Sequence, residues 1–312
     1  ALRPRWCSAM KRMARSAREI YDVPLFVNAA MNSRGRRPGE YPSAGPLAHL
    51  IDVWHCAAPS VDFIAPDLYD DGFKGWAAQY HLHNNPLFIP EIRHTQNNGV
   101  RAFYVFGEHN ALGFSPFAIE DGSDEQGTPF VEGYEKLREI MPLVTGWQGK
   151  DAMWGLLFDQ NDKERIIEDG SLVLTCRHNF TLPWDPRATD GSVWPEGGGI
   201  IIRIAENEYI VAGNGIVVEF ATASEKAFGK AAESLGEDGF ASAGSKGTGT
   251  PGRKAWKGTR CGIGSVDEVK VNADGSFSYI RRLNGDQDHQ GRHVRISVGD
   301  YKTLYVRLYE YQ

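Results

Sequence analysis

The chain has 312 residues, which is enough for one large or two ordinary domains. Hydrophobic residues make up 41% and charged residues 24% of it, as in globular proteins, and the net charge of −6 predicts neither a nucleic-acid partner nor an anionic membrane partner. No apolar run approaches the ~20 residues that a membrane-spanning helix requires.

The first half of the chain alternates between helical and extended patterns. Residues 1–22 carry an apolar stripe that includes Trp6, Met10 and Met13, opposite a basic face, which predicts an amphipathic helix. Apolar runs predict four buried strands, and apolar residues at helical spacing predict helices between them. The strands are predicted at 23–32, 61–69, 86–91 and 112–120, and the helices at 45–59, 72–84, from 98 onward and at 128–144. This order is typical of a parallel α/β unit, which we assign to residues 1–148.

The second half reads differently. Residues 149–312 contain many segments of alternating or β-branched and aromatic residues, separated by turn signals such as those at 212–215 and 273–276. They predict a β-rich second domain resembling a β-sandwich. Within it, residues 224–254 are rich in Gly, Ser, Ala and Lys, so we expect a flexible surface insertion with a short helix at its start.

Common cofactor and metal patterns are absent from the sequence. It has no GxGxxG or GxxxxGK[ST] phosphate loop, and its cysteines form neither a CxxC pair nor a disulfide framework. His81 and His83 are predicted on a helix, where they diverge by about 200°, so we interpret them as surface residues and not as metal ligands. We therefore predict no cofactor and no metal. The cysteines are Cys7, Cys56, Cys176 and Cys261.

Polar residues follow each predicted strand of the first unit. In parallel α/β folds the carboxyl ends of the strands form the usual ligand site, whether the sheet is open or closed into a barrel. Glu91 is the most unusual of these residues, because it ends the apolar run 87–89. A carboxylate there either caps the strand at the surface or is paired and used, since burial without a partner is costly. The set comprises Asn28, Asn32, Asp67, Tyr69, Glu91, Glu120 and Asp121.

Several segments carry a resemblance to a known family. "GEYPSAGPLAHLIDVW", "PSVDFIAPDLY", "PLFIPEIR" and "ALGFSPFAIED" resemble the later barrel strands of family 35 glycoside hydrolases, in particular bacterial β-galactosidases with an extra β-rich C-terminal domain. "RRLNGDQDHQGRHVRI" and "VRLYEYQ" resemble that extra domain. The resemblance implies that residues 1–148 form strands five to eight of a (β/α)₈ TIM barrel.

The resemblance also implies an activity: a retaining, exo-acting β-galactosidase that releases terminal β-galactose from oligo- or polysaccharides. Glu91 matches the nucleophile at the end of strand seven. The family's acid/base, a Glu at the end of strand four, would precede residue 1, so the missing N-terminal half of the barrel is an expected partner, in the same or a separate chain. Asn207 and Glu208 mimic the family's Asn-Glu pair, but they fall in a predicted β-turn. Without that half, we expect unpaired strand edges.

Further residues are candidates for contact with a β-galactoside substrate. Tyr69 either donates its hydroxyl to Glu91 or is a rim tyrosine satisfied by water. Asn32 either contacts the sugar or is a structural turn residue. Glu120 either contacts the sugar or only leads into the following loop. Trp54 and Trp76 lie on apolar helix stripes and are predicted core residues. The sugar-contact candidates are Asn28, Asn32, Glu40, Tyr41, Phe114 and Glu120.

Three alternatives stay open from the sequence. One is a non-catalytic carbohydrate-binding or structural module. Another is a related clan A glycosidase with a different sugar specificity. A homo-oligomer is a further alternative to a single chain.

Overall fold

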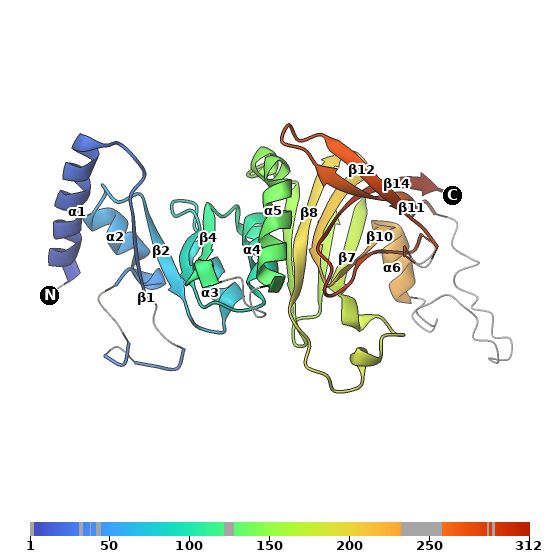
Figure 1. Cartoon of the computed structure of the whole chain (residues 1–312), viewed down its shortest axis with the longest axis horizontal. Helices are drawn as coiled ribbons and strands as arrows, with labels where there is room; N and C mark the ends of the chain where they lie inside the picture. Colours follow the sequence, from blue (N-terminus) through green and yellow to red (C-terminus); the bar gives the residue numbers. More distant parts are fainter. Residues whose placement is uncertain are drawn as a thin grey trace. The chain divides into compact units, whose positions relative to one another are not determined.

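The computed structural model describes residues 3–30, 34–37, 39–41, 45–121, 128–231, 258–285, 287–288 and 291–312. It divides into two compact units, Ala1–Tyr134 and Glu135–Gln312 (Figure 1). The boundary between them falls inside helix α5 (Thr128–Trp147).

The first unit is built on a parallel sheet in the order β1-β2-β3-β4, which confirms the four adjacent parallel strands expected from the sequence. Helices precede the sheet and alternate with its strands (Figure 1). The strands are β1 (Phe26–Ala30), β2 (Phe63–Leu68), β3 (Phe88–Ile92) and β4 (Gly113–Pro116). The helices are α1 (Arg3–Ile20), η1 (Ala48–Leu50), α2 (Ile51–Ala57), α3 (Phe73–Tyr80), α4 (Asn98–His109) and η2 (Ile119–Asp121), followed by the start of α5.

Apolar residues of the helices and of the strands form the core of this unit. Trp54 and Trp76 are each only 6% exposed, which confirms their predicted place in the core. The prediction that His81 and His83 lie on a helix is wrong, because α3 ends at Tyr80. The fully buried Asn85 explains this end: its amide nitrogen donates to the carbonyls of Tyr80 and Ile64, at 2.7 and 3.0 Å, and turns the chain back toward β2.

One face of the parallel sheet carries a layer of aromatic rings near the amino ends of its strands. Phe26 and Phe63 stack at 5.5 Å between ring centroids, and Phe88 meets Phe26 edge-on at 4.9 Å. Phe26 is nevertheless 41% exposed. In the described part of this unit, β1 pairs only with β2 and β4 only with β3, so the sheet has two unpaired edges.

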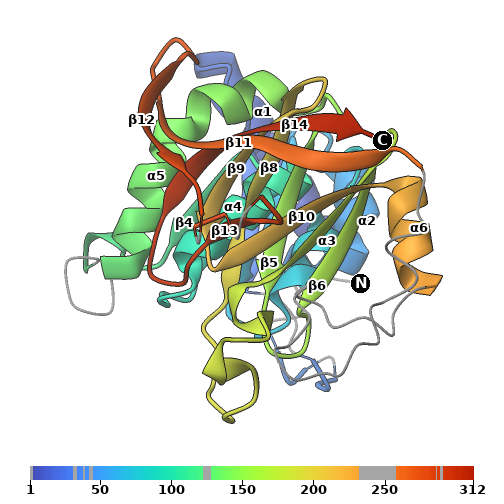
Figure 2. The same cartoon turned by 90° about the vertical axis from the view of Figure 1, so that its right-hand side faces the viewer.

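The second unit is β-rich, as the sequence predicts, and its strands form two antiparallel sheets (Figure 2). One sheet has the order β13-β10-β7-β6 and the other β12-β11-β14-β9-β8-β5. The strands are β5 (Met153–Phe158), β6 (Glu164–Asp169), β7 (Leu172–His178), β8 (Gly197–Ala205), β9 (Glu208–Asn214), β10 (Ile216–Thr222), β11 (Arg260–Val271), β12 (Phe277–Leu283), β13 (Val294–Ile296) and β14 (Lys302–Tyr311).

Two details of the second unit agree with the sequence. Asn207 has a φ of 59° in the turn between β8 and β9, so the Asn207–Glu208 pair belongs to a hairpin. Helix α6 (Ala223–Ala231) confirms the short helix expected at the start of the 224–254 segment. Residues 232–254 of that segment lie outside the described residues.

Both sheets contribute to one apolar core. Leu174 and Val218 of the smaller sheet and Val211 of the larger one are fully buried in the same cluster. The glycines at the start of β8 allow close packing there: a Cβ on Gly199 would lie 2.3 Å from the Ala212 carbonyl oxygen and 2.8 Å from Ile216 Cδ1. Because one of these neighbours is backbone, no side-chain rotation relieves the overlap.

We therefore predict that Gly199→Ala lowers the free energy of unfolding by about 1–3 kcal/mol, the usual range for overpacking a core. Gly146→Ala is the matched control, because Gly146 lies in α5 with open space at its Cβ position and should be neutral or stabilising by up to ~1 kcal/mol. Chemical denaturation of both variants checks the prediction. Equal stability of the two variants would contradict it.

Candidate functional site

A cluster of polar side chains lies at the carboxyl ends of β1, β2 and β3. Asp67 and Glu91 are register partners on neighbouring parallel strands, so their side chains leave the same face of the sheet. Asn28 of β1 joins them, because its Nδ2 donates a 2.7 Å hydrogen bond to Asp67 Oδ1. These three residues and Tyr69 are called the strand-end cluster below.

Tyr69 follows β2 and donates its hydroxyl to Glu91 Oε1. It is 38% exposed. Its own position is fastened by Arg93, which donates to the Tyr69 carbonyl oxygen and forms an ion pair with Asp71 at 3.6 Å. The sequence left two alternatives for Tyr69, a hydrogen bond to Glu91 or a rim position satisfied by water. The structure contains the hydrogen bond to Glu91.

The electrostatics of the strand-end cluster follow from partial burial and from two close carboxyl groups. Burial raises the pKa of Asp67, the bond from Asn28 acts against this, and the charge of Glu91 raises that pKa further. Burial and the bond to Glu91 raise the pKa of Tyr69 to about 12. Tyr69 is thus a protonated donor at neutral pH, with the Glu91 carboxylate as its acceptor.

Of the other predicted substrate contacts, those within the described residues form no hydrogen bond or ion pair with this cluster, and the rest lie outside the described residues. Asn32 belongs to the second group. Glu40 is exposed and accepts a 2.8 Å hydrogen bond from the Arg37 backbone N–H, and Tyr41 beside it is half-buried. Glu120 is exposed on η2. Phe114 is only 6% exposed and packs edge-on against Phe73 at 6.3 Å, so its ring is part of the core.

Asp67 is the residue that sequence reasoning did not select. The sequence places it near a strand end, but gives no reason to prefer it over the neighbouring Asp70 and Asp71. The useful signal is the alternation of β2, which, continued one residue past its end at Leu68, puts Asp67 and Tyr69 on one face. Only the β2–β3 register adds Glu91 to that face.

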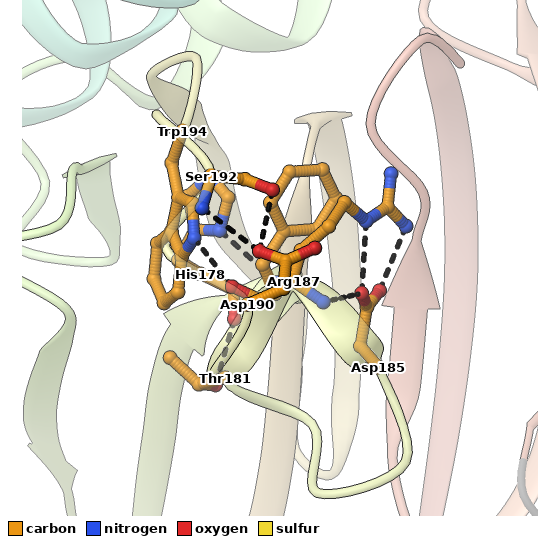
Figure 3. Close-up of polar contacts among 8 residues, drawn as sticks. His178, Thr181, Asp185, Arg187, Asp190, Ser192 and Trp194 are labelled. Carbon is orange, nitrogen blue, oxygen red and sulfur yellow. Dashed lines mark hydrogen bonds and ion pairs between the residues drawn. The ribbon is translucent and has the colours of Figure 1, made fainter.

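A second group of polar contacts fastens the loop between β7 and β8 (Figure 3). His178 is fully buried and stacks on Trp194, with 4.9 Å between ring centroids and 21° between the ring planes. Its Nδ1 accepts the Phe180 backbone N–H at 3.0 Å, so its Nε2 carries the proton and donates to the Pro195 carbonyl at 3.0 Å. The imidazole is thus neutral and has both nitrogens bonded.

The rest of this loop is also internally bonded (Figure 3). Arg187 donates from Nε and Nη2 to the two oxygens of Asp185, each at 2.8 Å, and its guanidinium lies 3.7 Å from the centre of the Phe180 ring. Asp190 accepts the Ser192 backbone N–H at 2.8 Å. Because these groups bond to one another, we interpret the cluster as one that stabilises the loop conformation and not as a ligand site.

The described residues contain no group of three or more His, Cys, Asp or Glu arranged to hold a metal ion. In the same part of the chain, no helix is both long and apolar enough to cross a membrane.

A family comparison covers most of the second unit. Residues 130–295, more than half of the chain, match the family described as "Domain of unknown function (DUF5597)". The chain belongs to the DUF5597 family. The DUF5597 match begins in α5, includes the His178–Trp194 loop and ends in β13, and it does not include the strand-end cluster. No curated protein matches the chain.

Buried, neutral His178 should make the stability of the DUF5597 domain depend on pH. Burial lowers the pKa of His178 from its ordinary 6.5 to about 4. Below pH 6.5 the unfolded chain binds a proton at His178 and the folded domain does not. The contribution of neutral His178 to the free energy of unfolding is therefore fully present well above pH 6.5 and is lost as the pH drops toward 4. We expect His178 alone to cost about 2 kcal/mol between pH 7 and pH 5.

The measurement is the free energy of unfolding at both pH values for the wild type and for His178→Asn. This variant keeps an acceptor for the Phe180 N–H but does not titrate, so its loss should be smaller than that of the wild type by about 2 kcal/mol. His83→Asn, which removes an exposed histidine, is the control and should behave like the wild type. An unchanged pH dependence in His178→Asn would contradict the assignment.

Proposed function

We propose that the full-length protein is a retaining glycoside hydrolase, an exo-acting β-galactosidase in which Glu91 is the nucleophile. The observation that carries the proposal is the Glu91 carboxylate at the carboxyl end of a parallel strand, with the Tyr69 hydroxyl bonded to it. Retaining glycosidases need an ionised, oriented carboxylate to form the glycosyl-enzyme ester. A phenol that stays protonated at neutral pH supplies both the orientation and the stabilisation of the charge.

The parallel sheet supports a barrel interpretation of the first unit. Four adjacent parallel strands with alternating helices are the repeating element of a (β/α)₈ barrel, and catalytic groups of such barrels collect at the carboxyl ends of the strands. We propose that these are strands five to eight. The unpaired edges of β1 and β4, as far as the chain is described, would then pair with strands of the other half, in the same or a separate chain.

The second carboxyl group of the mechanism is proposed to come from that other half. The two catalytic carboxyls of a glycosidase flank the scissile bond, and in retaining enzymes they stand about 5 Å apart. Asp67 is the carboxyl nearest in register to Glu91, but it leaves the same face of the sheet from the next strand. An acid that protonates the leaving oxygen approaches from across the sugar, where the family resemblance assigns a Glu of strand four.

Hydrolysis of an activated aryl β-galactoside by the full-length protein tests the nucleophile. With a good leaving group the first step needs little help from an acid, so the rate reports on Glu91. Glu91→Gln is nearly isosteric and should fold normally, but it should lose several orders of magnitude in kcat, as other hydrolases do without their nucleophile. Glu132→Gln, an exposed carboxylate on α5, is the control and should retain full activity.

Chemical rescue separates a missing nucleophile from a damaged fold. In Glu91→Ala, azide should enter the space of the lost carboxylate, restore turnover of the same substrate and yield the α-galactosyl azide. Near-normal kcat in Glu91→Gln would refute the nucleophile assignment. The 1–312 chain by itself should be inactive even on this substrate, because hydrolysis of the glycosyl-enzyme ester still needs a base to activate water. Turnover by it would mean that the acid/base lies within this chain.

A further inference from the structure

We propose that Asp67 is a sugar-specificity residue, whose second carboxylate oxygen accepts a hydrogen bond from a hydroxyl of the same sugar that Glu91 attacks. This inference rests on the proposed glycosidase function. It adds a residue to the site that neither the sequence resemblance nor the DUF5597 match assigns. The sugar hydroxyl is a donor, and a carboxylate is its natural acceptor.

The position of Asp67 is fixed from two sides. Asp67 lies in register with Glu91, so the two carboxyl groups are neighbours across one strand spacing of about 4.8 Å. Asn28, from the strand on the other side, donates to Asp67 Oδ1 at 2.7 Å. In the described part of the chain this bond is the only hydrogen bond of the Asp67 side chain, which leaves Oδ2 as an acceptor.

The order of the side chains along the sheet edge suits a single pyranose ring. Tyr69 follows Asp67 by two residues on the same face and bonds to Glu91 Oε1. Tyr69 and Asp67 thus both face Glu91 from the β2 side, and Asn28 of β1 bonds to Asp67 from the far side of that strand. A sugar with its anomeric carbon at Glu91 would present a neighbouring hydroxyl to Asp67.

The electrostatic situation of Asp67 favours such a ligand. Asp67 is half-buried beside a second carboxylate and has one donor, and burial and the Glu91 charge both raise its pKa. A hydroxyl donated by a sugar would stabilise the ionised form at this position. The alternative is a structural role, in which the Asn28–Asp67 bond merely ties the edge strand β1 to β2.

Deoxygenated substrates separate these two roles. The experiment measures kcat/KM of the full-length protein for an activated aryl β-galactoside and for analogues that lack one ring hydroxyl each. The wild type should lose about 10- to 100-fold on the analogue without the hydroxyl that Asp67 binds, as expected for a hydrogen bond to a charged group. Asp67→Ala should be slower on the parent substrate but show no further loss on that analogue.

For each protein, the loss is the ratio of kcat/KM for the parent substrate to kcat/KM for the analogue. Comparing this ratio between a variant and the wild type cancels the intrinsic reactivity of the analogue. Asp67→Asn keeps an acceptor oxygen without the charge and should show an intermediate loss, and it serves if Asp67→Ala does not fold. Asp52→Ala, an exposed carboxylate on α2, is the control and should discriminate like the wild type.

Two negative results remain distinct. A wild type that hydrolyses no glycoside overturns the proposed function together with this inference. The wild type could instead be active while the Asp67 variants lose as much kcat/KM as it does on every analogue. That result overturns this inference alone and leaves Asp67 as a structural residue.

Discussion

The β2–β3 register sets Asp67 and Glu91 side by side, and the rest of the strand-end cluster offsets the repulsion that follows. Partial burial and the charge of Glu91 both raise the pKa of Asp67. Each carboxyl group accepts a hydrogen bond from one neutral donor: Asp67 from the Asn28 amide and Glu91 from the Tyr69 hydroxyl. Arg93 holds the Tyr69 backbone without bonding to either carboxylate in the described contacts. The cluster is thus oriented, half-exposed and able to accept further donors.

The second unit uses its polar groups in the opposite way. His178, Asp185 and Arg187 are bonded within the loop that carries them, and the imidazole is held neutral by burial. Such a set of internal bonds stabilises one loop conformation. The described part of the DUF5597 domain is a β-rich unit whose loop bonds are internal, so the strand-end cluster stays the candidate for the proposed catalytic role.

Much of the first unit could be predicted from the sequence because its strands are short apolar runs with polar ends. The four strands, their parallel order and the core positions of Trp54 and Trp76 follow from hydrophobic period and spacing. The end of α3 could not be predicted, because it depends on Asn85, whose side chain bonds to backbone groups distant in sequence. A helical pattern across 72–84 carries no sign of that contact.

The candidate site also contains residues that the sequence could identify and others whose roles depend on the three-dimensional structure. Glu91 and Tyr69 could be selected from strand ends and from the family resemblance. The role of Asp67 depends on the β2–β3 register that sets it beside Glu91, and no count along the sequence gives that register. Phe114 was expected near the substrate, yet the alternation of β4 turns its ring toward Phe73 in the core.

The central claim is that Glu91 forms a covalent bond to the sugar. A 2-deoxy-2-fluoro β-galactoside with a good leaving group traps that ester, because the fluorine slows both its formation and its hydrolysis while the leaving group keeps formation the faster step. Incubation with the full-length protein, digestion with a protease and mass spectrometry of the peptides locate the attached sugar. If Glu91 is the nucleophile, a single label is expected on the peptide that contains it. A label on another carboxylate, or none on a protein that hydrolyses the unfluorinated substrate, would contradict it.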